Sequence, residues 1–333
     1  MYGKLARSFA LALSFATLAT SALAADRTVT IGYQTDIEPS KIAQAEGRYE
    51  KASGWKINWR KFSTGAEVIA AMASGDVQVG FTGSSPLAAG ITRGLPLQTF
   101  FIAAEIGSAE ALVVRNGSHI DNPKDLIGKK IAVPFVSTTH YSLLAALKHW
   151  DISPQQVTIL NLAPPEIAAA WQRGDIDAAY IWDPALGKIA KTGKVLTTSA
   201  DVRKWGAPTF LAWVARNDFA QAHPEFLVTF AKVTGDVNAE YRKDGANWTA
   251  NSPQIQEIAR VSGSDPADVP ALLRGTTFPL LSEQAGQTLL GGGTASALAD
   301  TSRFLKEQKR IDDVLHDYRP TVTASIVQQA SSR

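Results

Sequence analysis

Residues 73–81 read ASGDVQVGF, and residues 172–180 repeat the same plan as QRGDIDAAY. Each stretch follows a helix-like run, turns at Gly-Asp and continues as an apolar strand with an aromatic residue near its end. The opening strand recurs as well, because residues 29–35 (VTIGYQT) loosely match residues 130–138 (KIAVPFVST). We therefore predict two lobes that arose by duplication of one α/β plan.

Strand-like and helix-like runs alternate within the first predicted lobe. We expect strands at 29–35, 55–62 and 77–82, with helices at 65–73 and 84–92. This succession predicts an α/β fold in which each lobe is an open, mostly parallel sheet flanked by helices. Beyond Arg216 the sequence reads as helices that we expect to pack against the first lobe. These helices are expected at 223–241, 252–261, 268–273, 282–290 and 295–308.

The amino-terminal residues 1–24 have the features of a secretory signal peptide. Lys4 and Arg7 precede an uncharged apolar stretch at residues 8–20, and Ala22-Leu23-Ala24 fits the small-x-small cleavage pattern. A membrane anchor is the alternative, but a spanning helix needs about 20 apolar residues, and this stretch is shorter and contains Ser and Thr. We expect cleavage after Ala24 and a freely diffusing periplasmic protein.

Composition narrows the classes of function. The chain carries 33 Lys and Arg against 31 Asp and Glu, and loss of Lys4 and Arg7 with the signal peptide would make the two counts equal. A formally neutral protein has no strong basic bias toward nucleic acid or an anionic membrane. The chain contains no cysteine, so an exported form would take its stability from core burial without disulfides.

The residues just after the predicted strands are the candidates for a binding cleft. Ligands of open α/β sheets bind at the carboxyl ends of the strands, so these positions should face each other between the lobes. Half of them are small hydroxylic residues. The full set is Gln34, Thr35, Asp36, Gly83, Ser84, Ser85, Ser137, Thr138, Thr139, His140, Trp182 and Asp183.

Several segments resemble the periplasmic proteins that bind nitrate, sulfonates and taurine for ABC uptake systems, and the taurine-binding group in particular. The most specific segment is 137–147 (STTHYSLLAAL), and the similarity is densest from 125 to 219. Further matching segments are 33–35 (YQT), 83–86 (GSSP), 108–114 (SAEALVV), 125–134 (DLIGKKIAVP), 169–177 (AAWQRGDID) and 205–209 (WGAPT).

The resemblance implies a periplasmic-binding-protein fold of type II with two hinge crossings, near 113–116 and 210–215. Lobe 1 would comprise 25–113 and 214–333, and lobe 2 would comprise 114–213. The protein would be a monomer that captures taurine between its lobes and delivers it to an ABC permease in the inner membrane with its ATPase. A simple alkanesulfonate or another small organic anion is the alternative ligand.

The resemblance also has a departure at the expected ligand site. Members of the taurine-binding group often carry an aspartate two positions before the tryptophan that matches Trp213, and this chain has Leu211 there. Conversely, Asp183 stands where some members have a neutral residue. We therefore expect the carboxylates that face the ligand amine to be rearranged.

The hydroxyl-rich segments suit a sulfonate, which offers three acceptor oxygens and no proton. Ser137, Thr138 and Thr139 precede the helix expected at 141–149, and Ser84 and Ser85 open a helix of the first lobe. Hydroxyls, free backbone N–H groups and helix dipoles would then converge on one anion. The alternative is that these residues are ordinary helix N-caps.

The ammonium of taurine would need a carboxylate or an aromatic ring face. Glu110 and Asp183 are the candidate carboxylates, and Trp182 the candidate ring. Glu110 could instead be a solvated edge residue, Asp183 a cap of the following helix, and Trp182 a core residue. His140 is either a donor to the ligand or a packing residue.

The sequence lacks the motifs that other classes of function would require. The sequence contains no Cys, no Gly-x-Ser-x-Gly and no His-Glu-x-x-His, so catalysis is not expected. The other histidines show no metal-ligand spacing, and the glycines at 291–293 lack the Gly-Lys-Ser/Thr ending of a phosphate loop. We therefore expect no cofactor. A ligand-sensing regulator would share the two-lobed plan but would carry a DNA-binding helix-turn-helix instead of a signal peptide.

Overall fold

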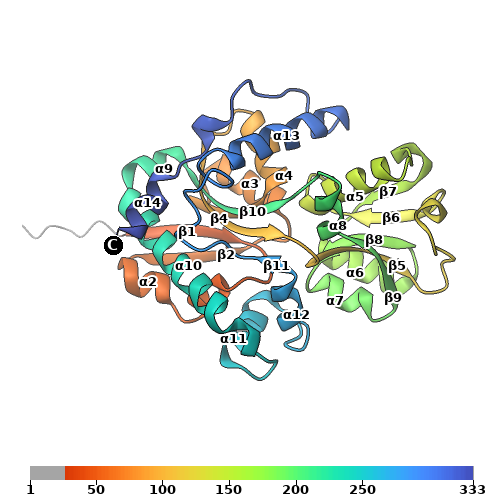
Figure 1. Cartoon of the computed structure of the whole chain (residues 1–333), viewed down its shortest axis with the longest axis horizontal. Coiled ribbons are helices and arrows are strands. Elements are labelled where there is room, and N and C mark those ends of the chain that lie inside the picture. Colours follow the sequence, from red (N-terminus) through yellow and green to blue (C-terminus); the bar gives the residue numbers. More distant parts are fainter. Residues whose placement is uncertain (1–26, 333) are drawn as a thin grey trace, which may run out of the picture.

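The computed structural model describes residues 27–332, so the predicted signal peptide lies outside the described residues. These residues form two separate β-sheets, each flanked by helices (Figure 1). We call the six-stranded sheet and the helices packed on it lobe 1, and the five-stranded sheet with its helices lobe 2. No helix in this described part of the chain is long and apolar enough to span a membrane.

Lobe 1 is built on the strand order β11-β4-β10-β3-β1-β2. Strand β1 runs parallel to its neighbours β2 and β3, whereas β10 runs antiparallel to both β3 and β4. The strands are β1 (Thr28–Tyr33), β2 (Lys56–Lys61), β3 (Val79–Gly83), β4 (Leu97–Ile106), β10 (Phe210–Arg216) and β11 (Thr276–Thr277).

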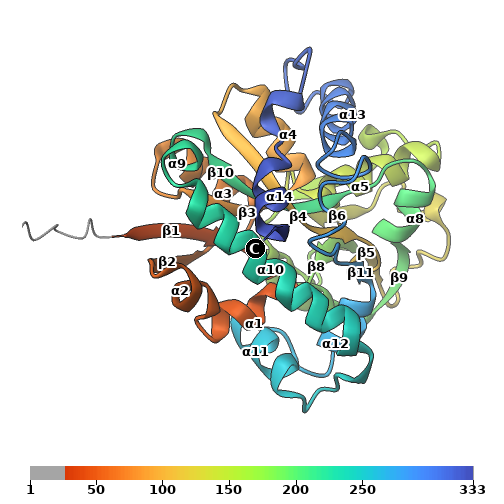
Figure 2. The same ribbon diagram turned by 60° about the vertical axis from the view of Figure 1, so that its left-hand side comes forward.

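Helices from both ends of the described chain cover lobe 1. Helix α10 packs against α2 and α14, and α13 packs against α4, as expected for the region after Arg216 (Figure 2). The helices are α1 (Ser40–Ala45), α2 (Arg48–Ser53), α3 (Gly65–Ser74), α4 (Ser84–Thr92), α9 (Asn217–Ala222), α10 (Pro224–Asp244), α11 (Pro253–Ser262), α12 (Val269–Arg274), α13 (Gly293–Glu307) and α14 (Ser325–Ser331).

The helix expected at 282–290 is wrong, because this segment folds as a series of turns. Its conformation is fixed by the buried side chain of Gln284, which accepts a hydrogen bond from Ile102 N and donates one to Ile102 O. The amide side chain therefore satisfies both backbone groups of a residue in β4. This long-range pairing outweighs the local preference of the segment for a helix.

Lobe 2 has the strand order β7-β6-β8-β5-β9. Its parallel pairs are β6 with β7 and β8, while β5 runs antiparallel to β8 and β9. The strands are β5 (Glu110–Arg115), β6 (Lys130–Val133), β7 (Thr158–Asn161), β8 (Ala178–Trp182) and β9 (Gly193–Thr198). The helices are α5 (Thr138–His149), α6 (Pro164–Arg173), α7 (Ala185–Ala190) and α8 (Ser199–Lys204).

The two sheets share one topology, as the repeated Gly-Asp stretch predicts. β2-β1-β3-β10-β4 in lobe 1 corresponds to β7-β6-β8-β5-β9 in lobe 2. Gly75 and Gly174 end the equivalent helices α3 and α6 with φ values of +88° and +81°, which glycine adopts without steric cost. The predicted two-lobed α/β class is confirmed, although each sheet is mixed rather than mostly parallel.

The chain crosses between the sheets at 107–109 and 205–209, because β5 belongs wholly to lobe 2 and β10 wholly to lobe 1. The crossings expected near 113–116 and 210–215 lie inside these strands, slightly too late in the chain. The connection between β4 and β5 consists only of Gly107, Ser108 and Ala109, and so short a break between two β-rich runs is hard to recognise in the sequence. We propose lobe boundaries at the two observed connections.

The lobes are also in contact away from these connections. The ring of Tyr141 in α5 lies edge-on against Phe304 in α13, with the ring centroids 4.7 Å apart. Lys148 of α5 pairs with Glu307 of α13 at 3.3 Å. The carboxyl-terminal end of α13 therefore bridges lobe 1 and lobe 2 on one side of the cleft.

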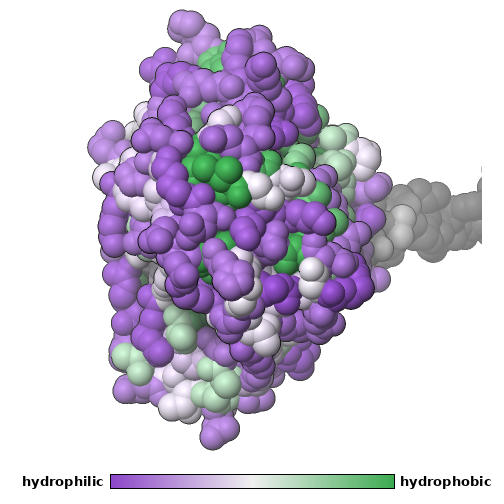
Figure 3. All heavy atoms as spheres, turned by 90° about the vertical axis from the view of Figure 1, so that its right-hand side faces the viewer, coloured by the Kyte–Doolittle hydropathy of each residue, from purple (hydrophilic) through white to green (hydrophobic). Residues whose placement is uncertain are grey.

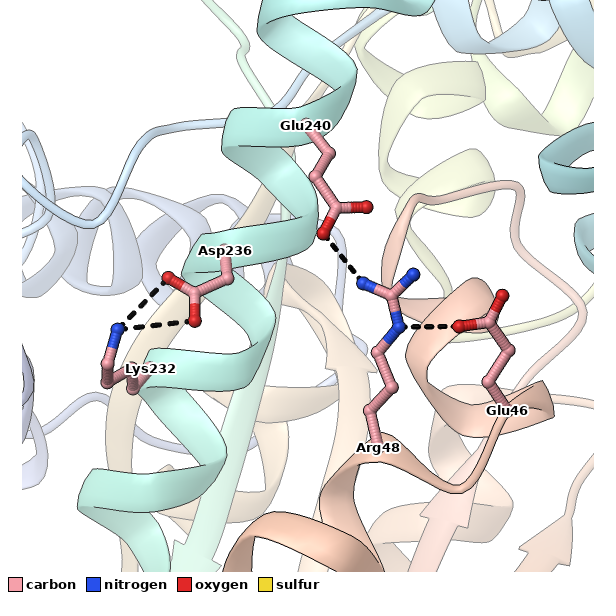
Figure 4. Close-up of polar contacts among 5 residues, drawn as sticks. All are labelled: Glu46, Arg48, Lys232, Asp236 and Glu240. Carbon is pink, nitrogen blue, oxygen red and sulfur yellow. Dashed lines mark hydrogen bonds and ion pairs between the residues drawn. The ribbon is translucent and has the colours of Figure 1, made fainter.

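The outer surface is polar. The face on the lobe 2 side is mostly hydrophilic, with apolar residues in small separate groups (Figure 3). On lobe 1, Arg48 lies between Glu46 and Glu240 at 2.6 and 2.7 Å and so ties α2 to α10, while Lys232 pairs with Asp236 along α10 (Figure 4). Exposed pairs of this kind contribute about 0.2–1 kcal/mol each.

Candidate functional site

Two adjoining cavities lie between the lobes and share Asp36, Glu110, Trp182 and Leu211. We call one the acidic cavity and the other the donor cavity. The acidic cavity is lined by Asp36, Ile37, Ile106, Ala109, Glu110, Trp182, Asp183, Leu211, Leu272 and Thr276. The donor cavity is lined by Gln34, Asp36, Gly65, Gly83, Pro86, Glu110, Ser137, Thr138, Trp182 and Leu211.

Three helices begin at the donor cavity. Gly65 is the first residue of α3, Gly83 immediately precedes α4, and Thr138 is the first residue of α5. Backbone N–H groups of a first helical turn lack intrahelical partners, and the helix dipole adds partial positive charge there. The donor cavity is therefore suited to an anion with several acceptor oxygens.

Glycine at two of these helix starts allows a close approach. A Cβ on Gly83 would lie 2.6 Å from Cγ2 of Thr138, which belongs to the other lobe. A Cβ on Gly65 would lie 2.7 Å from Thr82 Oγ1. Side chains at these positions would therefore separate the helix starts and open the donor cavity.

Ser137 serves its own helix as well as lining the donor cavity. Its hydroxyl accepts a hydrogen bond from His140 N at 3.0 Å and donates to Pro134 O at 2.6 Å. This is the N-cap arrangement that the sequence left open as an alternative. Gln34, at the end of β1, is also engaged, because its Nε2 donates to Phe81 O at 3.2 Å.

Glu110 is a buried residue and not a solvated edge residue. Its Oε1 accepts from Thr138 Oγ1 at 2.5 Å, and its Oε2 accepts from Ser199 Oγ at 3.0 Å. It stands opposite Trp182 in the antiparallel register of β5 and β8. Burial, together with the nearby charge of Asp36, raises the pKa of Glu110 to about 8.

Asp36 was expected in the cleft from the sequence, but without a role toward the ligand. It lies just beyond β1, lines both cavities, and has a buried Oδ2 without a hydrogen-bond partner among the described residues. Burial raises its pKa to about 6, against the opposing charge of Lys41. Its place directly after Gln34 and Thr35 was the available signal, but a polar residue after a strand is equally typical of a turn.

Trp182 and Asp183 come from the end of β8. Trp182 lines both cavities, and its Nε1 has no hydrogen-bond partner in the described part of the chain. Asp183 lines the acidic cavity, but its Oδ1 accepts from Gly187 N at 3.0 Å and so caps α7. Burial raises the pKa of Asp183 as well.

Five of the predicted site residues do not line either cavity. Thr35 lies in a neighbouring groove and donates to Asp183 O at 3.0 Å, which joins the lobes. Ser84 accepts from Phe210 N, Ser85 is buried, and Thr139 bonds to Ser137.

His140 has the packing role that was left open. Its ring stacks on Phe135 with the centroids 4.6 Å apart, and its Nδ1 accepts from Val136 N. Burial lowers the pKa of His140 to about 3, which keeps the ring neutral.

The structure brings together six predicted residues and Asp36. The six are Gln34, Glu110, Ser137, Thr138, Trp182 and Asp183. Among the described residues that line the two cavities there is no Lys, Arg or His, so the site joins a carboxylate-rich end to an end rich in helix starts. Residues 27–332 contain no cluster of His, Cys, Asp or Glu that could hold a metal ion.

Known proteins resemble this chain in sequence and in fold. Residues 27–254 match the family described as the substrate binding domain of ABC-type glycine betaine transport system. The taurine-binding periplasmic protein of Escherichia coli (strain K12) is 50% identical over 300 residues, which cover 90% of this chain and 92% of that protein. A putative aliphatic sulfonates-binding protein of Bacillus subtilis (strain 168) is 31% identical over 209 residues, 62% of each chain.

Among solved structures, the alkanesulfonate-binding protein SsuA from Xanthomonas axonopodis pv. citri, bound to MOPS, aligns with a TM-score of 0.74. The alignment covers 89% of this chain and 98% of that one at 24% identity, and it shows a shared fold. The chain belongs to the family of substrate-binding proteins of ABC-type transport systems, whose members bind a small solute and work with a membrane permease.

Proposed function

We propose that this protein binds taurine in the periplasm and delivers it to the permease of an ABC importer. The observation that carries the proposal is that Asp36 and Glu110 line the same two cavities, while no basic residue among the described residues lines either one. Three helices also begin at the donor cavity. Taurine carries a sulfonate at one end and an ammonium at the other. Each end of the site suits one of these groups.

The donor cavity supports the sulfonate end. The starts of α3, α4 and α5 offer backbone N–H groups and the positive ends of three helix dipoles, which together favour a monoanion without a full counter-charge. The Thr138 hydroxyl is turned toward Glu110, so the backbone groups are the principal donors on the lobe 2 side.

The acidic cavity supports the ammonium end. A buried carboxylate needs a cation or several hydrogen bonds to remain charged, and Asp36 Oδ2 has no hydrogen-bond partner in the described residues. A bound ammonium would supply the missing partner, with Trp182 as a flanking ring. A simple alkanesulfonate would instead bring a negative charge and no cation to these carboxylates, which favours taurine over the alternative ligand.

The position of Leu211 is consistent with this arrangement. Leu211 lines both cavities at the position where the resemblance led us to expect an aspartate, and it offers no carboxylate to the ligand. Asp36 lines the same two cavities and carries the charge that Leu211 lacks. We infer that Asp36 and Glu110 together replace the missing aspartate.

The remaining parts of the transport role are also proposals. We infer export by cleavage after Ala24, action as a monomer, and a permease that works with an ATPase. N-terminal sequencing of periplasmic material checks the first point. A mature protein that still began at Met1 or stayed bound to the membrane would contradict it.

Titration of the chain from residue 25 onward with taurine, ethanesulfonate, β-alanine and nitrate tests the ligand assignment. We expect calorimetry to find taurine as the tightest ligand, because ethanesulfonate and nitrate lack the ammonium and β-alanine offers two acceptor oxygens instead of three. Saturation at a hundred times the dissociation constant should stabilise folding by about 2.7 kcal/mol. Tighter binding of ethanesulfonate than of taurine would support the alkanesulfonate alternative instead.

A further inference from the structure

A buried ion pair lies a few residues along the chain from Asp36 and Ile37, which line the acidic cavity. Lys41, near the start of α1, has a fully buried side chain, and its Nζ lies 3.3 Å from Glu38 Oε1, which is also buried. The ammonium lies 4.8 Å from the ring centroid of Tyr33 and 5.2 Å from that of Phe81. Asp36 and Glu38 lie in the short connection between β1 and α1, and Lys41 is in the first turn of α1.

Stability alone does not account for this pair. Removing two charges from water costs several kcal/mol per ion, and the attraction within a buried pair often fails to offset that cost. The Lys41 Nζ has no hydrogen-bond partner among the described residues, so its geometry is not that of a fully satisfied pair. An aliphatic residue of similar length would fit the surrounding rings at a lower cost.

The pair acts electrostatically on Asp36. The positive charge of Lys41 lowers the pKa of Asp36, and the negative charge of Glu38 raises it. Lobe 2 contributes two further carboxyl groups to the acidic cavity, Glu110 and Asp183. The other ionisable groups around the segment are Tyr33 and Tyr49 beside Lys41 and Glu38, and Asp265 and Asp268 beside Asp183.

We propose that Lys41 and Glu38 are positioning residues that set the charge of Asp36, and with it the preference of the cleft for a ligand that carries an ammonium group. The proposal rests on the proposed function and adds to it a charge control located outside the ligand cavity. Lys41 keeps Asp36 ionised before the ligand arrives, against the burial that favours the protonated form. Glu38 holds Lys41 in place and limits how far its charge acts.

Opposite shifts in the pH profile of taurine binding test the proposal. Affinity should fall at low pH as Asp36 takes up a proton, with a lower limb near its pKa of about 6. Lys41→Met removes the cation with little change in length, and should move this limb to higher pH by about one unit. Glu38→Gln removes the anion and leaves Lys41, so it should move the same limb to lower pH.

A merely structural role would weaken binding in both variants without moving the limb in opposite directions. Lys51→Met is the matched control, because Lys51 is exposed and distant from the cavity lining, and its profile should match that of the unchanged protein. Circular dichroism checks that each variant folds. If Lys41→Met does not fold, the lower limb of the Glu38→Gln pH profile tests the proposal by itself: a shift to lower pH supports it, and no shift or a shift to higher pH overturns it.

The result separates the two proposals. An unchanged protein that fails to bind taurine contradicts the proposed function. An unchanged protein that binds taurine, with variants whose lower limbs stay in place or move the same way, overturns only the role of Lys41 and Glu38.

Discussion

The hydroxyl of Thr138 donates a hydrogen bond to Oε1 of Glu110 across 2.5 Å. The first residue of α5 is thereby tied to the first residue of β5, and the two ends of the proposed ligand site are coupled. Thr138 lines the donor cavity, whereas Glu110 lines both cavities. A change at Thr138 should therefore be felt at the carboxylate end as well as at the anion end.

Thr138→Val should weaken taurine binding about ten- to hundredfold, since a hydrogen bond to a charged group contributes about 1.5–3 kcal/mol. The loss should be smaller for ethanesulfonate, because the missing donor mainly serves Glu110. Calorimetric titration of both ligands measures the difference. Ser199→Ala removes the other donor to Glu110 and should show the same selectivity. Equal losses for both ligands would mean that Thr138 serves the sulfonate directly.

Glu110→Gln and Asp36→Asn should each weaken taurine strongly and leave ethanesulfonate unchanged or improved. Each substitution removes a group that can carry the charge facing the ammonium. Asp36→Asn also spares an anionic ligand an unpaired buried carboxylate, whereas Glu110 is largely protonated when no ammonium is bound. Asp183→Asn is the control, because its carboxylate also caps α7 and should matter less for ligand choice. Taurine affinities within two-fold of the unchanged protein in both variants would refute amine recognition by this pair.

Taurine affinity should rise with pH between about 6 and 8. The pKa of Glu110 is raised to about 8 in the ligand-free site, so the group is largely protonated at neutral pH. A bound ammonium favours the ionised form, and binding therefore releases a proton. Titrations in buffers with different ionisation enthalpies measure that release. Binding that is independent of pH across this window would indicate that Glu110 does not pair with the ammonium.

Gly83→Ala should weaken binding of every sulfonate ligand with little effect on the stability of the separate lobes. The added Cβ would lie 2.6 Å from Cγ2 of Thr138 and would hold the lobes apart. Thr138→Ser removes that methyl group and keeps the hydroxyl, so the double variant should recover most of the affinity. Recovery would be absent if Gly83 were required for a reason other than this interlobe contact.

The sequence predicted those parts of the fold that depend on local patterns. Helix α4 was expected at 84–92 and spans Ser84–Thr92, because Ser-Ser-Pro starts it and Gly94, with φ +82°, follows its end. Gly75 and Gly174 end the equivalent helices α3 and α6, and the Gly-Asp pattern at both places predicted the shared topology of the two lobes. Each of these signals acts within a few residues of its effect.

Other features depend on residues distant in the sequence and could not be predicted. The turns at 282–290 are fixed by Gln284, whose side chain bonds to Ile102 of β4. Asp36 was expected in the cleft, but its role toward the ligand follows only when Glu110 and Trp182 are found to line the same cavity. Polar residues after strands mark the cleft, whereas their individual roles depend on which partners the other lobe supplies.

A crystal structure of the mature protein with taurine tests the central claim most directly. The account predicts the ammonium within hydrogen-bond distance of Asp36 and Glu110, and the sulfonate oxygens at the starts of α3, α4 and α5. A taurine molecule bound in the reverse orientation, or outside the two cavities, would contradict it.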